Sequence, residues 1–214
     1  VFAPLGGFWG PLLALLSAVT MCYGNLAAIP QTHIKRLLGY SSIGHAGYLL
    51  MGLSTGTSNG VAAVAYYLLA YLVSNLTVFL VVVVVANAGG ERLDDYRGLS
   101  RRSGALAAAM FVGLLSLAGV PPLAGFVVKL LVLLAAADSR RLWLVAVGAV
   151  NVAISLYYYL MVVKRMYLEP PTNPSPIRLH PLTGTVLALL VLGIFVIGIF
   201  QEPFLQSISS ALRP

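Results

Sequence analysis

Long runs without charged residues dominate the chain. Four of them contain no Asp, Glu, Lys or Arg and approach the roughly 20 residues that span a bilayer as a helix, namely residues 10–29, 61–86, 142–163 and 182–200. A fifth run, residues 37–54, has His45 as its only basic residue. We predict a transmembrane helix in each of the five runs.

A sixth apolar run, residues 105–137, is too long for one straight span. Its 33 residues would measure about 50 Å as a helix at ~1.5 Å per residue, against a hydrocarbon core of about 30 Å. Pro121 and Pro122 remove backbone donors and clash with the preceding turn, while Gly119 and Gly125 permit unusual dihedral angles. We therefore predict that this helix is broken near residues 119–125.

These elements define the fold class and the domain organisation. The sequence predicts an all-α, polytopic transmembrane helix bundle of about six spans, one of them discontinuous, in a single domain of residues 1–214. The expected helices are residues 8–30, 34–54, 60–88, 105–137, 142–165 and 182–200. Because the chain begins Val-Phe-Ala-Pro, without an initiator Met or a basic segment, we expect it to be part of a longer protein.

Composition agrees with a membrane protein and argues against several kinds of site. Of the 214 residues, 59% are hydrophobic and 9% charged, whereas a soluble domain has about 25% charged residues. The single cysteine, Cys22, cannot supply the several thiolates of a zinc site or an iron–sulfur cluster. The sequence also has no nucleotide-binding motif and no cluster of His or carboxylate residues with metal spacing. We therefore expect no cofactor and no metal in this chain.

The net charge of +7 indicates membrane topology rather than a nucleic-acid-binding surface. The basic residues occur in short clusters between apolar runs, and six spans sort these clusters onto two faces of the membrane. One face receives nine of them, Lys35, Arg36, Arg92, Arg97, Arg101, Arg102, Lys164, Arg165 and Arg178, and the other receives Arg140, Arg141 and Arg213. By the positive-inside rule the first face is cytoplasmic. Both ends of the chain are then expected on the non-cytoplasmic side of a bacterial inner membrane.

Lys129 is the one Lys or Arg residue that belongs to neither face, because it lies inside the predicted span of residues 105–137. All six acidic residues fall in or beside loops, so no carboxylate within a span of this chain can pair with it. A lysine at the centre of a membrane helix costs about 2.5–3.5 kcal/mol, and loss of hydration favours its neutral form. It also follows the helix break, where unwound backbone lines a cavity. We predict that Lys129 exchanges protons; the alternative is that it extends to the head groups of the far face.

The predicted helix of residues 34–54 carries a polar stripe. Ser41, His45 and Tyr48 are separated by four and three residues, so they share one helix face. A histidine titrates near ~6.5 when unperturbed, which suits a proton path, but a hydrogen-bonded structural His45 fits the pattern equally well. Weaker polar candidates, which can instead hold helices together, are Tyr40, Ser42, Ser74, Asn75, Asn151 and Tyr157 to Tyr159.

Three stretches, in this order and spacing, carry a resemblance to a known family. They are Gln31–Tyr48, Leu115–Phe126 followed by Lys129, and Tyr157–Leu160. They resemble subunit N of bacterial NADH:quinone oxidoreductase, called subunit 2 in mitochondria, a relative of the large subunits of multisubunit sodium/proton antiporters. The first two patterns recur across this antiporter-like group, and the triple tyrosine resembles subunit N in particular. The resemblance covers essentially the whole chain but only the carboxyl-terminal half of the family's length.

The resemblance implies both a fold and roles for two lysines. It implies that the chain is the second of two inverted five-helix repeats, each with a broken helix, plus one closing helix. It also implies that Lys129 is the buried lysine of the second broken helix and that Lys35 approaches a central polar axis. Composition alone, in contrast, makes Lys35 an ordinary basic residue at a cytoplasmic helix end. FMN, the iron–sulfur clusters and the quinone are then expected in other subunits.

From these observations we expect a proton-translocating membrane-arm subunit of an NADH:quinone oxidoreductase, in contact with other membrane subunits, lipid, protons and water. Moving a proton against ~100 mV costs about 2.3 kcal/mol, which a partner must supply. One alternative is a subunit of a cation/proton antiporter, against which the missing intramembrane carboxylate weighs modestly. Another is a structural subunit in which Lys129 binds a partner helix.

Overall fold

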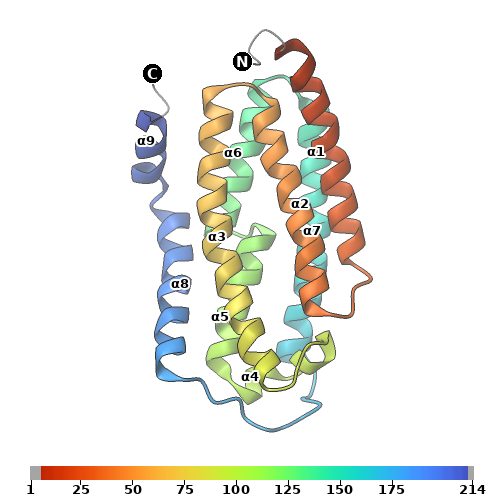
Figure 1. Cartoon of the computed structure of the whole chain (residues 1–214), viewed down its shortest axis with the longest axis vertical. Coiled ribbons are helices and arrows are strands. Elements are labelled where there is room, and N and C mark those ends of the chain that lie inside the picture. Colours follow the sequence, from red (N-terminus) through yellow and green to blue (C-terminus); the bar gives the residue numbers. More distant parts are fainter. Residues whose placement is uncertain (1–5, 212–214) are drawn as a thin grey trace.

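The computed structural model describes residues 6–211, and within them the chain is a bundle of helices without β-strands (Figure 1). This confirms the all-α class expected from the sequence. The elements in chain order are α1 (Gly6–Ala28), α2 (Ile34–Ser54), α3 (Ser58–Asn87), the short 3₁₀-helix η2 (Leu93–Tyr96), α4 (Leu99–Arg102), α5 (Gly104–Ala118), α6 (Ala124–Asp138), α7 (Leu142–Leu168), α8 (Pro181–Ile199) and α9 (Gln201–Ala211).

The long helices have the dimensions of membrane spans. Four of them, α1, α3, α7 and α8, are long and apolar enough to cross a membrane, by length and composition. Helix α2 has 21 residues, about 31 Å at ~1.5 Å per residue, and packs along α1. Helices α5 and α6, of 15 residues each, follow one another along the bundle (Figure 1). The bundle thus contains the discontinuous helix that the sequence predicts.

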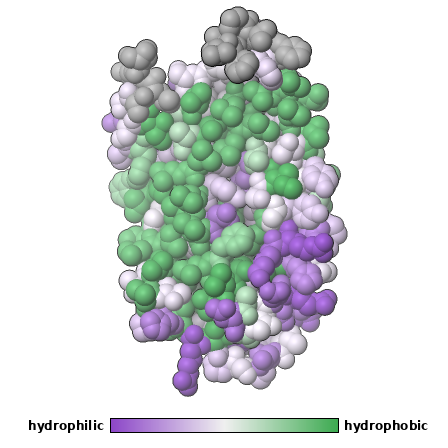
Figure 2. All heavy atoms as spheres, in the orientation of Figure 1, coloured by the Kyte–Doolittle hydropathy of each residue, from purple (hydrophilic) through white to green (hydrophobic). Residues whose placement is uncertain are grey.

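Basic side chains divide unequally between the two ends of the bundle. The connections α1–α2, α3–α5 and α7–α8 lie toward the bottom of Figure 1, and those between α2 and α3 and between α6 and α7 lie at the top. The nine basic residues assigned to one face in the sequence analysis belong to the first of these ends, and we name it the basic end. Hydrophilic side chains gather toward the basic end in Figure 2. Arg140 and Arg141 lie at the opposite end, and Arg213 lies outside the described residues.

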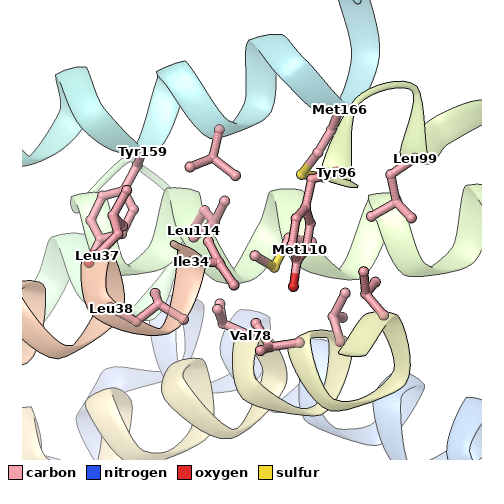
Figure 3. Close-up of a cluster of buried hydrophobic side chains, with 14 of the residues drawn as sticks. Ile34, Leu37, Leu38, Val78, Tyr96, Leu99, Met110, Leu114, Tyr159 and Met166 are labelled. Atoms are coloured by element: carbon pink, nitrogen blue, oxygen red, sulfur yellow. The ribbon is translucent and has the colours of Figure 1, made fainter. Parts of the chain in front are cut away.

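An apolar cluster near the basic end joins the spans to the segment between α3 and α5 (Figure 3). The spans contribute Ile34 and Leu38 from α2, Val78 from α3, Met110 and Leu114 from α5, and Tyr159 and Met166 from α7. Tyr96 of η2 and Leu99 of α4 are buried in the same cluster, which ties these short elements to the bundle. A second apolar cluster, which includes Leu123 and Ala124 beside the helix break, fills the other half.

Three short elements, η2, α4 and α9, were not predicted, because none contains an apolar run long enough to be recognised. In α9, the spacing of Phe204, Leu205 and Ile208 gives one apolar side, which packs against the second cluster. The Phe204 ring lies 6.1 Å from the ring of Tyr66 on α3, and the Tyr66 hydroxyl donates to the Ile197 carbonyl of α8. Helix α9 therefore packs against α3.

The closest helix pair, α1 and α2, packs through small residues. A Cβ added at Gly24 of α1 would lie 2.4 Å from the backbone nitrogen of Gly44 on α2 and 2.8 Å from the Tyr40 carbonyl oxygen. In lipid, helices associate mainly by such close backbone packing, because lipid tails are as apolar as the side chains. The position of α2, and of every polar side chain on it, depends on this approach.

We predict that Gly24→Ala destabilises the bundle by about 1–3 kcal/mol, because the added methyl group overlaps backbone atoms that cannot rotate away. The measurement is the thermal unfolding midpoint of the purified membrane assembly. Gly39→Ala is the matched control, since no atom lies within 4 Å of a Cβ added at Gly39. Equal midpoints for the two variants would show that α1 and α2 are packed differently.

Candidate functional site

The connection between α5 and α6, residues 119–123, breaks the helix near the middle of the bundle (Figure 1). Pro121 and Pro122 are joined here by a cis peptide bond, and Gly119 ends α5 with a φ of 90°, in the left-handed region that favours glycine. Helix α8 covers the connection, since a Cβ added at Gly198 would lie 2.4 Å from the Pro122 carbonyl oxygen. Non-helical backbone is tolerated at membrane depth when protein buries it in this way.

The last four carbonyl groups of α5 have no partner within the helix, and two of them are capped by the chain that follows. The N–H groups of Gly119 and Val120 both donate to the Leu115 carbonyl at 3.0 Å, and the Gly119 N–H also donates to the Ser116 carbonyl at 3.0 Å. The glycine cap thus leaves two carbonyls, those of Leu117 and Ala118, for another donor.

Lys129 of α6 is that donor. Its Nζ donates to the Leu117 and Ala118 carbonyls at 2.9 Å each and lies 3.4 Å from Ser155 Oγ on α7. None of these partners, found among residues 6–211, is a carboxylate. The residue is 3% exposed, and Nζ lies 5.2 Å from the centre of the Tyr48 ring. The α5 dipole and the ring favour an ammonium, whereas burial favours the neutral amine, and such opposed influences suit a group that gains and loses a proton.

Ser116 connects the two half-helices to α3. Its Oγ accepts a hydrogen bond from the Gly125 N–H at 3.2 Å, in the first turn of α6, and lies 2.8 Å from Ser74 Oγ on α3. A Cβ added at Gly125 would lie 1.7 Å from the Ser116 carbonyl oxygen, so only glycine permits this approach of α5 and α6. Ser74, one of the predicted polar candidates, therefore lies beside the helix break.

His45 of α2 is buried among hydroxyl groups. Its Nδ1 lies 2.7 Å from the hydroxyl of Tyr67 on α3, and its Nε2 lies 3.4 Å from the hydroxyl of Tyr159 on α7. The Tyr159 hydroxyl is hydrogen-bonded in turn to Ser41 Oγ. Tyr48, the last member of the predicted stripe, donates from its hydroxyl to a backbone carbonyl of α7 at 2.8 Å. The stripe therefore faces α3 and α7 inside the bundle.

A small cavity of about 10 Å³ lies between this histidine cluster and the helix break. It is lined by residues of both groups, His45, Tyr67 and Tyr71 together with Ser116, Leu117 and Gly125. This volume is about that of a single water molecule, and the surface of the cavity is mostly apolar.

Sequence reasoning missed four polar residues of this interior, Asn25, Tyr67, Ser116 and Ser155. Asn25 of α1 donates to Asn151 Oδ1 and accepts from the Tyr158 hydroxyl, at 2.9 Å in each case. A signal for α7 was present in the sequence, because Asn151, Ser155 and Tyr159 are each four residues apart and therefore share one helix face. Asn25 is isolated among apolar residues and gave no such pattern.

Lys35 lies at the basic end, apart from the buried polar groups. Its Nζ lies 2.6 Å from Glu91 Oε1, and the two side chains are 51% and 59% exposed. The hydrogen bond from Lys35, and then its positive charge, lower the pKa of the Glu91 carboxyl below its ordinary value. Within the described residues Lys35 does not contact Lys129 or His45. Its place on a central polar axis stays a prediction.

Two polar lining candidates face away from the interior, and one lies at its edge. Ser42 is exposed, Tyr157 is 54% exposed, and Tyr40 is half-buried. Consecutive residues of a helix point about 100° apart, so where Ser41 and Tyr158 face inward, their neighbours face out. Ser42 and Tyr157 thus lie outside the buried polar cluster of this chain, and their role as polar lining stays a prediction.

The fold and the site define a class of protein: a polytopic membrane subunit with a discontinuous helix of the kind found in transporters. The chain belongs to the family described as "NADH:quinone oxidoreductase/Mrp antiporter, TM", which matches residues 1–155. The NADH-quinone oxidoreductase subunit N of Moorella thermoacetica is 43% identical over 201 residues, which cover 93% of this chain and 42% of that protein.

Two solved structures show the same fold. A chain of respiratory complex I from Thermus thermophilus with bound aureothin has a TM-score of 0.81 and 33% identity, and the match covers 92% of this chain and 45% of that one. A chain of the Mrp complex from Dietzia sp. DQ12-45-1b has a TM-score of 0.88, with coverage of 95% and 47%, but its 21% identity shows likeness of fold alone. The present chain spans less than half the length of each of these relatives.

We predict that Gly125→Ala destabilises the assembly by about 1–3 kcal/mol, because the added methyl group pushes α6 away from the end of α5. The thermal unfolding midpoint of the purified assembly measures the effect. Gly184→Ala is the control: a Cβ there would meet only the Leu179 side chain, at 3.3 Å. An unchanged midpoint for Gly125→Ala would contradict the close approach at the break.

Proposed function

We propose that this chain is part of a proton-translocating membrane-arm subunit of an NADH:quinone oxidoreductase of the complex I type. The single observation that carries the proposal is Lys129, a buried lysine whose only described hydrogen-bond partners are carbonyl and hydroxyl groups at a helix break. Ionisable residues buried in membrane helices most often serve transport. The similarity to NADH-quinone oxidoreductase subunit N supports the second part of the proposal, that the complex is an NADH:quinone oxidoreductase.

The geometry around Lys129 supports proton exchange without loss of structure. A neutral amine has two N–H groups, and the carbonyls of Leu117 and Ala118 accept two hydrogen bonds at 2.9 Å. The third proton of the ammonium points to the longer contact, 3.4 Å to Ser155 Oγ. We therefore assign this third proton as the one that is released, while the other two keep the end of α5 capped in both states.

The path for this proton runs, in our proposal, between Lys129 and the histidine cluster. Water in the small cavity would join the break to His45, which contacts Tyr67 and Tyr159. Lys35 would act as a further relay on the side of the basic end, once its bond to Glu91 is released. The part of the related proteins that lies outside the match, more than half of their length, would complete the path.

Other subunits supply the energy and the redox chemistry in this proposal. FMN, the iron–sulfur clusters and the quinone site are assigned to them, and this chain is assigned no catalytic redox site, cofactor or metal. The chain would contact neighbouring membrane-arm subunits and lipid, in a bacterial inner membrane. The nine basic residues support a cytoplasmic basic end, and both ends of the described chain would then lie on the non-cytoplasmic side.

A second candidate function is a subunit of a multisubunit cation/proton antiporter. The family description includes the Mrp antiporter, and the Mrp chain from Dietzia superposes closely. This function predicts sodium-dependent proton flux without quinone reduction. Mass spectrometry of the native assembly separates the two, because flavin and iron–sulfur subunits accompany only the redox-driven complex.

We predict that Lys129→Ala lowers the number of protons pumped per electron while the complex still assembles, because the exchangeable group is lost. Lys129→Arg should lower it as well, since arginine can cap α5 but does not release its proton at physiological pH. Proton-to-electron stoichiometry in reconstituted vesicles, measured beside quinone reduction, gives the answer.

Lys164→Ala is the matched control, because Lys164 is an exposed lysine near the basic end of α7. It should leave the stoichiometry unchanged. Normal stoichiometry in both Lys129 variants would rule out the relay. Failure of Lys129→Ala to assemble, together with normal pumping by Lys129→Arg, would leave Lys129 with a structural role only.

A further inference from the structure

A crevice lies at the end of the bundle opposite the basic end, between α3, α6 and α9. One compartment of about 400 Å³ is mostly apolar, and its lining includes Ala63, Leu131, Leu134 and Leu205. A second compartment of about 380 Å³ shares Asn59, Ala135 and Asp138 with the first. Each compartment has the size of a small-molecule site. The two together offer an apolar groove that leads to a polar mouth.

The crevice is separate from the Lys129 site. The four α6 residues that line it, Leu131, Leu134, Ala135 and Asp138, lie roughly 140° to 240° around the helix from Lys129, at about 100° per residue. They therefore occupy the opposite face of α6. The crevice is therefore not a continuation of the polar interior.

The polar mouth offers hydrogen-bond acceptors and one negative charge. It is lined by the Asp138 carboxylate, the Asn59 amide and the hydroxyl groups of Thr55, Thr57 and Ser139. The Ser139 Oγ is buried and has no hydrogen-bond partner within the described residues. No lysine or arginine is among the residues that line either compartment. This combination suits a primary ammonium group, which has three N–H donors and a positive charge.

We propose that the crevice binds a phospholipid with a primary-amine head group. The ammonium lies in the mouth with Asp138 and the hydroxyl groups, and one acyl chain follows the apolar groove beside Leu134. Arg140, the exposed second residue after Asp138, has the charge to meet the lipid phosphate. A choline head group has no N–H donor, and an anionic glycerol head group meets the Asp138 charge, so both bind more weakly. The site does not depend on the proposed proton relay.

Lipid titration of the native assembly tests the proposal. The assembly is purified, stripped of lipid by detergent exchange, and titrated separately with phosphatidylethanolamine, phosphatidylcholine and phosphatidylglycerol while native mass spectrometry counts the bound lipids. We expect Asp138→Asn to lose one phosphatidylethanolamine site, with an affinity lower by about tenfold, as expected when a charge-assisted hydrogen bond is lost. Glu202→Gln, which changes an acid of α9 that is not among the lining residues, should keep the site.

The apolar groove has its own pair of variants. Leu134→Trp should fill the groove and remove the same lipid, whereas Leu130→Trp, on the same helix but outside the lining, should retain it. Equal binding of all three lipids, or unchanged phosphatidylethanolamine binding by Asp138→Asn, would overturn the proposal. A photoreactive side chain at position 134 that cross-links to another protein subunit instead of lipid would overturn it as well.

Discussion

The carbonyl groups at the end of α5 lie in the interior of the bundle, and the rest of the site follows from how they are satisfied. An unpaired backbone carbonyl costs several kcal/mol in a membrane, so a helix end at this depth is stabilised by donors from the protein or from water. Gly119 allows the chain to turn back and cap two carbonyls, and Lys129 donates to the other two. The same geometry that permits the break therefore holds an ionisable side chain in a buried position.

The contact of Lys129 with the end of α5 therefore has both a structural role, the capping of the helix, and a proposed functional role, proton exchange. A lysine that only capped the helix would need no neighbouring polar groups beyond the carbonyls. Here the Ser155 hydroxyl and the Tyr48 ring also lie near the amine. Because these two side chains belong to α7 and α2, the positions of both helices affect the environment of the ionisable group.

Much of the fold was predictable because a membrane span requires a long apolar run. The break was predictable because Pro121 and Pro122 interrupt such a run that is too long for one span. Lys129 and the stripe of His45 could be identified from charge and helical spacing. Which Ser and Tyr side chains face the buried polar cluster was harder to predict. Ser42 and Tyr157 are of the same residue type as their neighbours Ser41 and Tyr158, and only the rotation of each helix determines which of the two faces inward. The hydrogen bonds of Asn25 and the packing of α9 against α3 depend on tertiary contacts that have no local pattern.

The central claim is that Lys129 changes its protonation state during turnover. Infrared difference spectroscopy of the assembly, with lysine isotopically labelled, measures this directly, because the ammonium and amine groups absorb differently and the label shifts both bands. The account predicts a lysine signal that appears on turnover and is absent when position 129 is arginine. A lysine signal that is identical in the two proteins, or no lysine signal during active turnover, would contradict it.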